Sequence, residues 1–241
     1  MYDAMEQFEI KEILPLKISG YDVGFTNSAL CMVLTVTIII AIFAFCLRKR
    51  QLIPGAAQCV PESIYEFIYN MIVSNMGKAG LKYFSFIFTL FLFVVTGNLL
   101  GLFPYSFTFT SHLAAVGTLS LLALVVNICA GIKNKKWGYL RTFFPQGVPW
   151  AMAPLIIPIE VISLLSKPFS LTIRLVANMT VGHIMLKSIA SFVVAIGLLG
   201  GEIPLAFAGL IIAFEIFIGI LQAYIYTILS CIYLSDALHD H

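Results

Sequence analysis

Charged residues are scarce in this sequence. Of its 241 residues, 14 are lysine or arginine and 12 are aspartate or glutamate, so only 11% are charged and the net charge is +2. A soluble globular domain carries about a quarter charged residues and roughly half apolar ones. Here 60% of the residues are apolar. This composition excludes an ordinary soluble domain and predicts a protein that crosses a membrane several times, and the small net charge gives no reason to expect nucleic acid as a partner.

Motifs for several chemistries are also missing. The sequence has no G-x-x-x-x-G-K-[ST] loop for nucleotide phosphates, no H-E-x-x-H zinc motif and no G-x-S-x-G nucleophile motif. Its five cysteines form no C-x-x-C pair and are best explained as small buried apolar side chains. The N-terminal stretch MYDAMEQFEIKEIL is acidic and lacks the basic start of a signal peptide. We therefore expect no cofactor, no metal and no catalysis by this chain alone.

Three apolar runs have the length of a simple membrane crossing. A bilayer core of about 30 Å needs roughly 20 apolar residues in a helix. Such runs cover Ser28–Leu47, Tyr83–Leu102 and His112–Ile132, after an N-terminal segment of residues 1–27. Basic residues gather between the first and second runs and after the third, whereas the loop Phe103–Ser111 has no charge. Because inner loops are rich in lysine and arginine, the N-terminus is predicted to lie outside.

A shorter amphipathic segment lies between the first two runs. In residues 61–76, PESIYEFIYNMIVSNM, apolar side chains recur with helical spacing and two glutamates lie on the other face. The apolar residues are Ile64, Phe67, Ile68, Met71 and Ile72. A segment of about 16 residues is too short to cross the bilayer, so we predict a helix that lies on the membrane surface. Its polar face is either solvated or a contact for a partner.

The C-terminal third contains two apolar stretches that are too long for a perpendicular crossing. Pro154–Ile196 would form a helix of about 65 Å, and Leu205–Leu234 one of about 45 Å. Residues 154–234 are therefore predicted to be a hairpin of strongly tilted or broken helices, with the turn at GLLGGEIP, Gly197–Pro204. The predicted fold class is an all-α polytopic membrane protein with about five crossings and the surface helix, and its C-terminus returns inside.

Few charged residues remain inside the predicted spans. Glu160, Lys167, Arg174 and Lys187 lie in the first long stretch, and Glu215 lies in the second. Each intramembrane charge costs about 3 kcal/mol on insertion scales and marks a candidate functional residue. The two lysines have structural explanations, because one precedes a proline and the other can extend toward the membrane surface. Arg174 is too deep for that and stays charged, so it must face protein, water or an opposite charge.

Helical spacing distributes the polar residues of the first long stretch over two faces. Asn178 follows Arg174 by four residues and shares its face, and Glu160 lies five helical turns before Asn178. About 21 Å along the axis would separate Glu160 from Arg174 in one straight helix, which excludes a direct pair. His183 lies nine residues after Arg174 and on the opposite face, where it is either a hydrogen-bonded core residue or a proton relay.

The second long stretch has a polar face of its own. Gln222 follows Glu215 by seven residues, so the two lie on one side of the helix. An acid among apolar residues is most easily held in its neutral form, which suits a group that takes up and releases protons. An antiparallel hairpin would bring this face toward the first stretch.

Three segments carry a specific family pattern. They are PIEVISLLSKPFSLTIRLVANMTVGH (from Pro158), FEIFIGILQAYIYTILSCIYLSDA (from Phe214) and GNLLGLFPYSFTFTSH (Gly97–His112). The first two closely resemble subunit a of the rotary F-type ATP synthases, in its mitochondrial type or the related bacterial members, and the third resembles the end of the second span in that family. These matches cover roughly residues 84–112 and 150–236, about half of the chain, and the first 80 residues match only in layout.

The resemblance implies a role for each polar residue of the spans. Arg174 resembles the essential arginine that faces a rotating ring of c subunits, and Asn178 resembles the asparagine one turn later. Gln222 resembles the glutamine opposite the arginine. Glu160 resembles the acid of the half-channel on the inner side.

A polar pair completes the implied site. His183 and Glu215 resemble the two residues that line the half-channel from the outer side. Many bacterial members carry the acid and the histidine at exchanged positions. Since an acid and an imidazole are present in either order, the resemblance implies contact between the two helices.

The resemblance implies a stator proton channel and not an enzyme in its own right. It would couple proton flow to rotor rotation and ATP synthesis, with an arginine between two offset aqueous half-channels. The implied partners are the ring of c subunits, peripheral-stalk subunits of the b type, the lipid bilayer and the translocated protons. The implied location is the inner membrane of a bacterium or a mitochondrion, with the N-terminus outside and the C-terminus inside.

Two other classes of function are open from the residues alone. A proton-coupled secondary transporter would be expected to show internal repeats, and the sequence has no clear one. An intramembrane hydrolase would need one of the motifs that are missing here.

Overall fold

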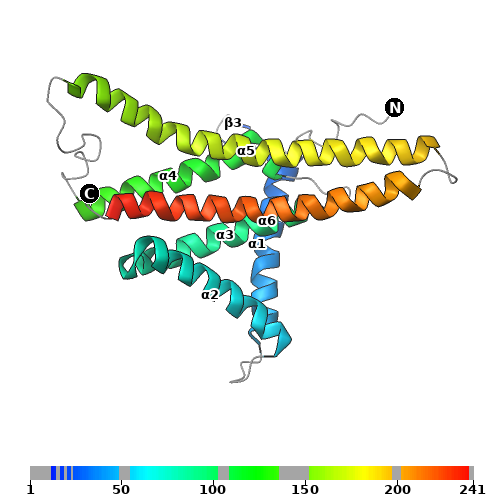
Figure 1. The fold of residues 1–241 in the computed structure, drawn as a ribbon, viewed down its shortest axis with the longest axis horizontal. Helices are drawn as coiled ribbons and strands as arrows, with labels where there is room; N and C mark the ends of the chain where they lie inside the picture. The colour runs from blue at the N-terminus through cyan, green and yellow to red at the C-terminus, as the bar shows by residue number, and fades with distance from the viewer. Residues whose placement is uncertain are drawn as a thin grey trace. The chain divides into compact units, whose positions relative to one another are not determined.

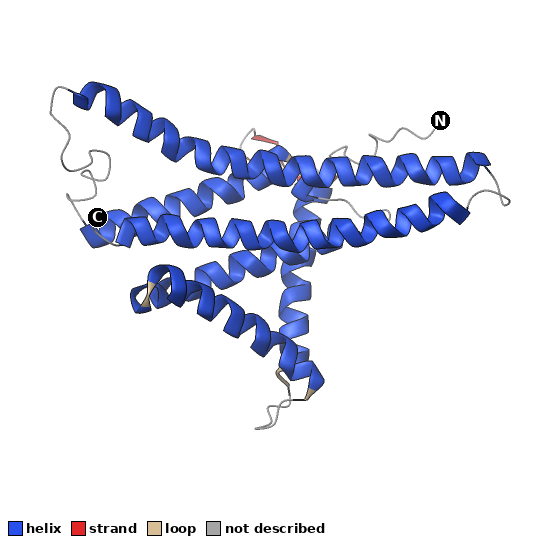
Figure 2. Cartoon of the chain, in the orientation of Figure 1, coloured by secondary structure: helices blue, strands red, loops and turns tan. Residues whose placement is uncertain are grey.

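The computed structural model describes residues 12–14, 17–18, 21–22, 24–48, 55–102, 109–135, 152–196 and 202–238, and nearly all of this part of the chain is helical (Figure 2). Its α-helices, labelled in Figure 1, are α1 (Asn27–Cys46), α2 (Ala56–Met76), α3 (Phe84–Gly101), α4 (Leu113–Lys135), α5 (Ala153–Ile196) and α6 (Glu202–Leu238). Two short 3₁₀ helices precede α3 and α4, namely η2 (Lys78–Tyr83) and η3 (Phe109–Ser111).

Four very short strands precede α1. β1 (Glu12–Leu14) pairs antiparallel with β4 (Phe25–Thr26), and β2 (Lys17–Ile18) pairs antiparallel with β3 (Tyr21–Asp22). Thr26 then caps α1, because its hydroxyl accepts a hydrogen bond from the Ala29 backbone at 3.4 Å. The rest of the predicted outer segment of residues 1–27, and residues 197–201 of the predicted turn, lie outside the described residues.

Five of the described helical segments are long and apolar enough to cross a membrane. They are Asn27–Cys46, Lys78–Gly101, Leu113–Asn134, Pro154–Val193 and Leu205–Asp236. The prediction of an all-α polytopic membrane protein with about five crossings is therefore confirmed. α2 is not among the candidate spans, and its place on the membrane surface stays a prediction.

The two longest helices are continuous. α5 has 44 residues and α6 has 37, which correspond to about 66 Å and about 56 Å at 1.5 Å per residue. Pro158 and Pro168 lie inside α5 and do not break it. The sequence left open whether these two stretches form tilted continuous helices or broken ones, and in the structure they are continuous. A helix of this length fits a hydrocarbon core of about 30 Å only when it is steeply inclined.

Contacts divide the chain into two compact units, which we describe separately. Unit 1 comprises Met1–Arg50, Phe91–Val116 and Arg174–Tyr224. In it, the second part of α5 pairs antiparallel with the first part of α6. The amide of Asn178 donates to the Gln222 Oε1 across 3.5 Å, and four residues further along α5, Gly182 packs against Glu215.

α3 joins unit 1 through a buried polar contact. The amide of Asn98, which is fully buried, donates a hydrogen bond of 3.0 Å to the Gly219 carbonyl of α6. The ring of Phe109, from η3, packs against Gly97 and lies 5.4 Å from the Phe93 ring, centroid to centroid.

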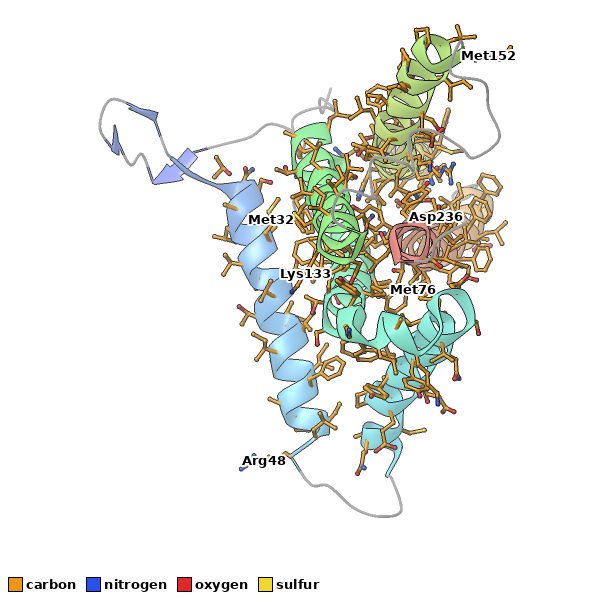
Figure 3. All side chains as sticks on the ribbon, turned by 90° about the vertical axis from the view of Figure 1, so that its left-hand side faces the viewer. Met32, Arg48, Met76, Lys133, Met152 and Asp236 are labelled. Carbon is orange, nitrogen blue, oxygen red and sulfur yellow. The ribbon has the colours of Figure 1, made fainter. Side chains whose placement is uncertain are left out.

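Unit 2 comprises Gln51–Leu90, Gly117–Ile173 and Ile225–His241. The predicted apolar stripe of α2 supplies part of its core, since Ile68, Met71 and Ile72 are buried. The last part of α6 meets the end of α2, where the Ser235 hydroxyl donates to the Asn75 carbonyl at 2.9 Å. Figure 3 labels Met76, which directly follows Asn75, and Asp236, which directly follows Ser235.

The first part of α5 contacts both α4 and α6 inside unit 2. The hydroxyls of Ser120 in α4 and Thr172 in α5 lie 2.8 Å apart. The Lys167 Nζ lies 4.5 Å from the centre of the Tyr233 ring of α6, a cation–π contact. These contacts hold three helices around one region of unit 2.

A glycine with a positive φ ends α2. Gly77 has φ 63° and ψ −165°, a conformation that is essentially restricted to glycine. We predict that Gly77→Ala lowers the free energy of unfolding by about 1–3 kcal/mol, measured by thermal unfolding of the purified chain in detergent. The control is Gly117→Ala in α4, whose added Cβ meets only the Thr172 methyl at 3.9 Å. Equal unfolding midpoints for the two variants would contradict the strain argument.

Candidate functional site

Arg174 lies on an exposed face of α5 in unit 1. Asn178, Val181 and Met185 recur at helical spacing on the same face and are exposed as well. None of the described residues forms a hydrogen bond or an ion pair with the guanidinium of Arg174. α5 therefore presents a cation and one amide on a face that is otherwise apolar.

His183 and Glu215 lie on the buried side of the same helix pair. His183 is 7% exposed and Glu215 is 6% exposed. The exposed Arg174 and the buried His183 agree with the opposite faces predicted from their spacing of nine residues. The polar residues of unit 1 are thus divided into an exposed group and a buried group.

Gly182 provides the space for the Glu215 carboxyl group. A Cβ placed on Gly182 would lie 2.7 Å from the Glu215 Cδ and closer still to its Oε1. Neither carboxylate oxygen accepts a hydrogen bond from any described residue. The structure thus brings Glu215 against the residue that precedes His183, and it gives no hydrogen bond between the carboxylate and the imidazole.

The hydrogen bond between Asn178 and Gln222 connects the two groups. Asn178 is exposed beside Arg174, whereas Gln222 is 1% exposed and lies two turns beyond Glu215 on α6. The structure brings together Asn178 and Gln222, whereas the resemblance implied that Gln222 lies opposite Arg174. Asn98 of α3 is a polar neighbour that the sequence analysis missed, since its bond partner is a backbone carbonyl 121 residues away.

A second polar region lies in unit 2. A cavity of about 90 Å³ is lined by residues of α4, α5 and α6. Its polar lining includes Ser120, Asn127, Glu160, Lys167, Ser230 and Asp236. Glu160 and Asp236 are both partly exposed carboxylates, and Lys167 supplies a cation. The arrangement can hold water and exchange protons with it.

Four of these six lining residues were not predicted, namely Ser120, Asn127, Ser230 and Asp236. Asp236 comes after the apolar stretch that ends at Leu234, so it was not counted among the intramembrane charges. Asn127 is an amide in an apolar run, but Ser120, Asn127 and Asn134 are each seven residues apart. This repeat places the three polar residues along one side of a helix, and it could have predicted a polar face on α4.

The four polar residues that helical spacing places along one side of α5 are divided between the two units. Glu160 and Lys167 belong to unit 2, and Arg174 and Asn178 belong to unit 1. In unit 1, Arg174 and Asn178 lie with α3 and the first part of α6. In unit 2, Glu160 and Lys167 lie with α4 and the last part of α6. Among the described residues, no three histidine, cysteine or acidic side chains are grouped to hold a metal ion.

Comparison with known proteins extends the resemblance beyond the motifs. Residues 29–235 match the family described as ATP synthase A chain. Proteins named ATP synthase subunit a from Rhodospirillum rubrum and Paramagnetospirillum magneticum are 51% and 47% identical, and each alignment covers 100% of both chains. A third, from Mesorhizobium japonicum, is 45% identical over 98% of this chain and 96% of its own. These alignments include the first 80 residues, in which the sequence motifs had shown a resemblance to the family only in the layout of the segments.

The close approach of Gly182 to Glu215 gives a test of the buried group. In Gly182→Ala the new methyl group must displace the carboxyl end of Glu215, because that flexible end is the nearest atom group. We expect proton transport in membrane vesicles to fall roughly tenfold, since small displacements of a reacting group have large effects on rate, while the amount of chain in the membrane is unchanged. Gly209→Ala is the control, because its added Cβ meets nothing within 4 Å. Normal transport in Gly182→Ala would mean that the position of this carboxyl group is not critical.

Proposed function

The chain belongs to the family of ATP synthase A chains, and from this premise we propose that it is the stator subunit through which protons reach and leave the rotor of an F-type ATP synthase. The family and the five apolar helices make it a multi-pass protein of an energy-transducing membrane. The relatives named above are bacterial proteins, which favours a bacterial inner membrane. Nucleotide chemistry would then take place on other subunits of the complex.

The observation that carries the proposal is the exposed Arg174. A permanent cation on the apolar face of a membrane helix is costly unless an opposite charge or water meets it. Within the described part of the chain nothing pairs with it. The complementary partner is a carboxylate inside the membrane on another chain, as a ring of c subunits would supply. Asn178, exposed on the same face, supports Arg174 at that contact.

The buried group of unit 1 is proposed to be the outer half-channel. His183 and Glu215 can each take up and release a proton, and both are shielded from lipid. The Asn178–Gln222 hydrogen bond gives a polar connection from the buried side of the helix pair to the face of Arg174. Gln222 and Asn178 therefore act as polar support between the relay and the rotor.

The cavity of unit 2 is proposed to be part of the inner half-channel. Glu160 lines this cavity, and the family resemblance implies that Glu160 is the acid of the inner half-channel. Asp236 adds a second carboxylate to the lining. Ionised acids at an aqueous exit attract a proton that leaves the rotor and pass it to water. This assigns the inner path to α4, the first part of α5 and the last part of α6.

These assignments define a cycle. A rotor carboxylate takes a proton from the outer path and becomes neutral, and a neutral carboxyl group can face lipid at far lower cost than a carboxylate. After nearly a full turn it loses the proton to the inner path and meets Arg174 as an anion. The fixed charge of Arg174 stabilises that anion and repels protons, which prevents a direct leak. Each proton that crosses 100 mV supplies about 2.3 kcal/mol to the rotation.

The rest of the chain is proposed to anchor this machinery. The basic residues of its loops support an orientation with the N-terminus outside and the C-terminus inside. Subunits of the b type in the peripheral stalk would hold the chain against rotation. Together the segments form one membrane domain of residues 1–241, with residues 154–234 as the inclined hairpin.

Arg174→Ala tests the gate. ATP-driven proton pumping by membrane vesicles should be abolished, because no fixed charge then stabilises the rotor anion or blocks a direct proton path, while the complex still assembles. The vesicles should also show a passive proton leak. Val181→Ala, seven residues further along the same exposed face, should pump normally. A variant without the arginine that pumps at the normal rate would refute the proposed function.

A double exchange tests the relay. His183→Glu combined with Glu215→His should retain more pumping than either single change, because the acid and the imidazole are then both still present between α5 and α6. The measurement is the initial rate of ATP-driven acidification, compared at equal amounts of assembled complex. An equal loss in the two single variants and in the double variant would count against contact between these residues.

A further inference from the structure

The polar stripe of α4 contains a residue that the proposed cycle has not used. Ser120, Asn127 and Asn134 recur every seven residues, so they lie along one side of α4. The two outer members have hydrogen-bond partners. Ser120 contacts the Thr172 hydroxyl at 2.8 Å, and the Asn134 amide donates to the Ala130 carbonyl at 2.9 Å.

Asn127, the middle member, is different. It is 6% exposed, and its Oδ1 accepts no hydrogen bond from any described residue. It also lines the cavity of unit 2. A buried amide oxygen that accepts no hydrogen bond is unfavourable, so such an oxygen at a cavity wall indicates an ordered water molecule.

The cavity has the room and the chemistry for water. A cavity needs about 10–15 Å³ of space open to water to hold one water molecule, so a volume of about 90 Å³ is enough for several. An ordered water also needs two to four polar partners. Ser230 is one, because its hydroxyl donates to the Tyr226 carbonyl at 2.9 Å and keeps its oxygen free to accept from water. Glu160 and Asp236 supply carboxylate oxygens in the same lining.

We propose that Asn127 is a positioning residue that anchors a short column of water in this cavity, and that the column conducts protons to Glu160 and Asp236. This inference rests on the proposed function, because the proposed function assigns the cavity of unit 2 to the inner half-channel. It gives Asn127, in the α4 wall of that path, a role of its own. Each water accepts a proton from one neighbour and passes another on, so only O–H bonds form and break and no co-reactant is needed.

Two substitutions of Asn127 separate water from packing. Leucine has the same branching at Cγ, is larger and has no polar atom, so Asn127→Leu should exclude the water column and reduce ATP-driven proton pumping about tenfold. Serine is smaller and keeps a hydroxyl, so Asn127→Ser should leave room for an additional water and retain pumping within about twofold. If Asn127 were needed only for packing, the order would reverse, because serine leaves the larger void.

The matched control lies on the same stripe. Asn134 is exposed, already has partners and is not part of the cavity lining. Asn134→Leu should therefore pump normally. Arg174→Ala is measured beside these variants. Loss of pumping in Arg174→Ala together with normal pumping in Asn127→Leu overturns the water column and leaves the proposed function standing, whereas normal pumping in both overturns the proposed function.

Labelling gives a second readout that does not depend on turnover. In complexes whose native cysteines are replaced, Asn127→Cys should react with a water-soluble, positively charged methanethiosulfonate applied from the inner side. Ala130→Cys, which is buried and outside the cavity lining, should stay unlabelled. Absence of labelling at position 127 overturns the inference, and this measurement decides the question if Asn127→Leu fails to assemble.

Discussion

The cost of a charge inside a bilayer is the constraint on which the rest of this structure depends. Arg174 cannot lose its proton under physiological conditions, and no described residue of the chain pairs with it. α5 exposes it on an apolar face, while Glu215 and Gln222 are buried against the neighbouring helix. The chain therefore buries Glu215 and Gln222 between helices and leaves the cation exposed.

The antiparallel pairing of α5 and α6 gives the two polar regions their separate surroundings. In unit 1, Gly182 lets the Glu215 carboxyl group approach α5, and α3 adds Asn98, which donates to the Gly219 carbonyl. In unit 2, Lys167 lies over the Tyr233 ring, and α4 completes the cavity. A different third helix thus encloses each region. Two proton paths that must not be joined directly would need such a division, since a proton that passed straight from one to the other would do no work.

Continuous helices matter for the same reason. A broken α5 would have freed backbone groups that need partners inside the membrane. Pro158 and Pro168 instead lie within 44 unbroken residues, so one helix carries Glu160, Arg174 and His183. For Arg174 and His183, a spacing of nine residues in a continuous helix gives opposite faces. This explains why the opposite placement of Arg174 and His183 followed from simple counting, and why the sequence alone left a broken helix open.

The amino-acid sequence by itself determined the fold class, the number of crossings, the family and the residues that bring polarity into the spans. It did so because a bilayer imposes a minimum length on each helix and because so few charges remain inside. Only the tertiary structure decided which polar groups meet. Asn98 and Gly219 are 121 residues apart, and Ser120 and Thr172 are 52 apart. Such contacts, the position of Glu215 against Gly182 and the cavity around Asn127 depend on how helices pack and in which register, and no local pattern of residues specifies that register.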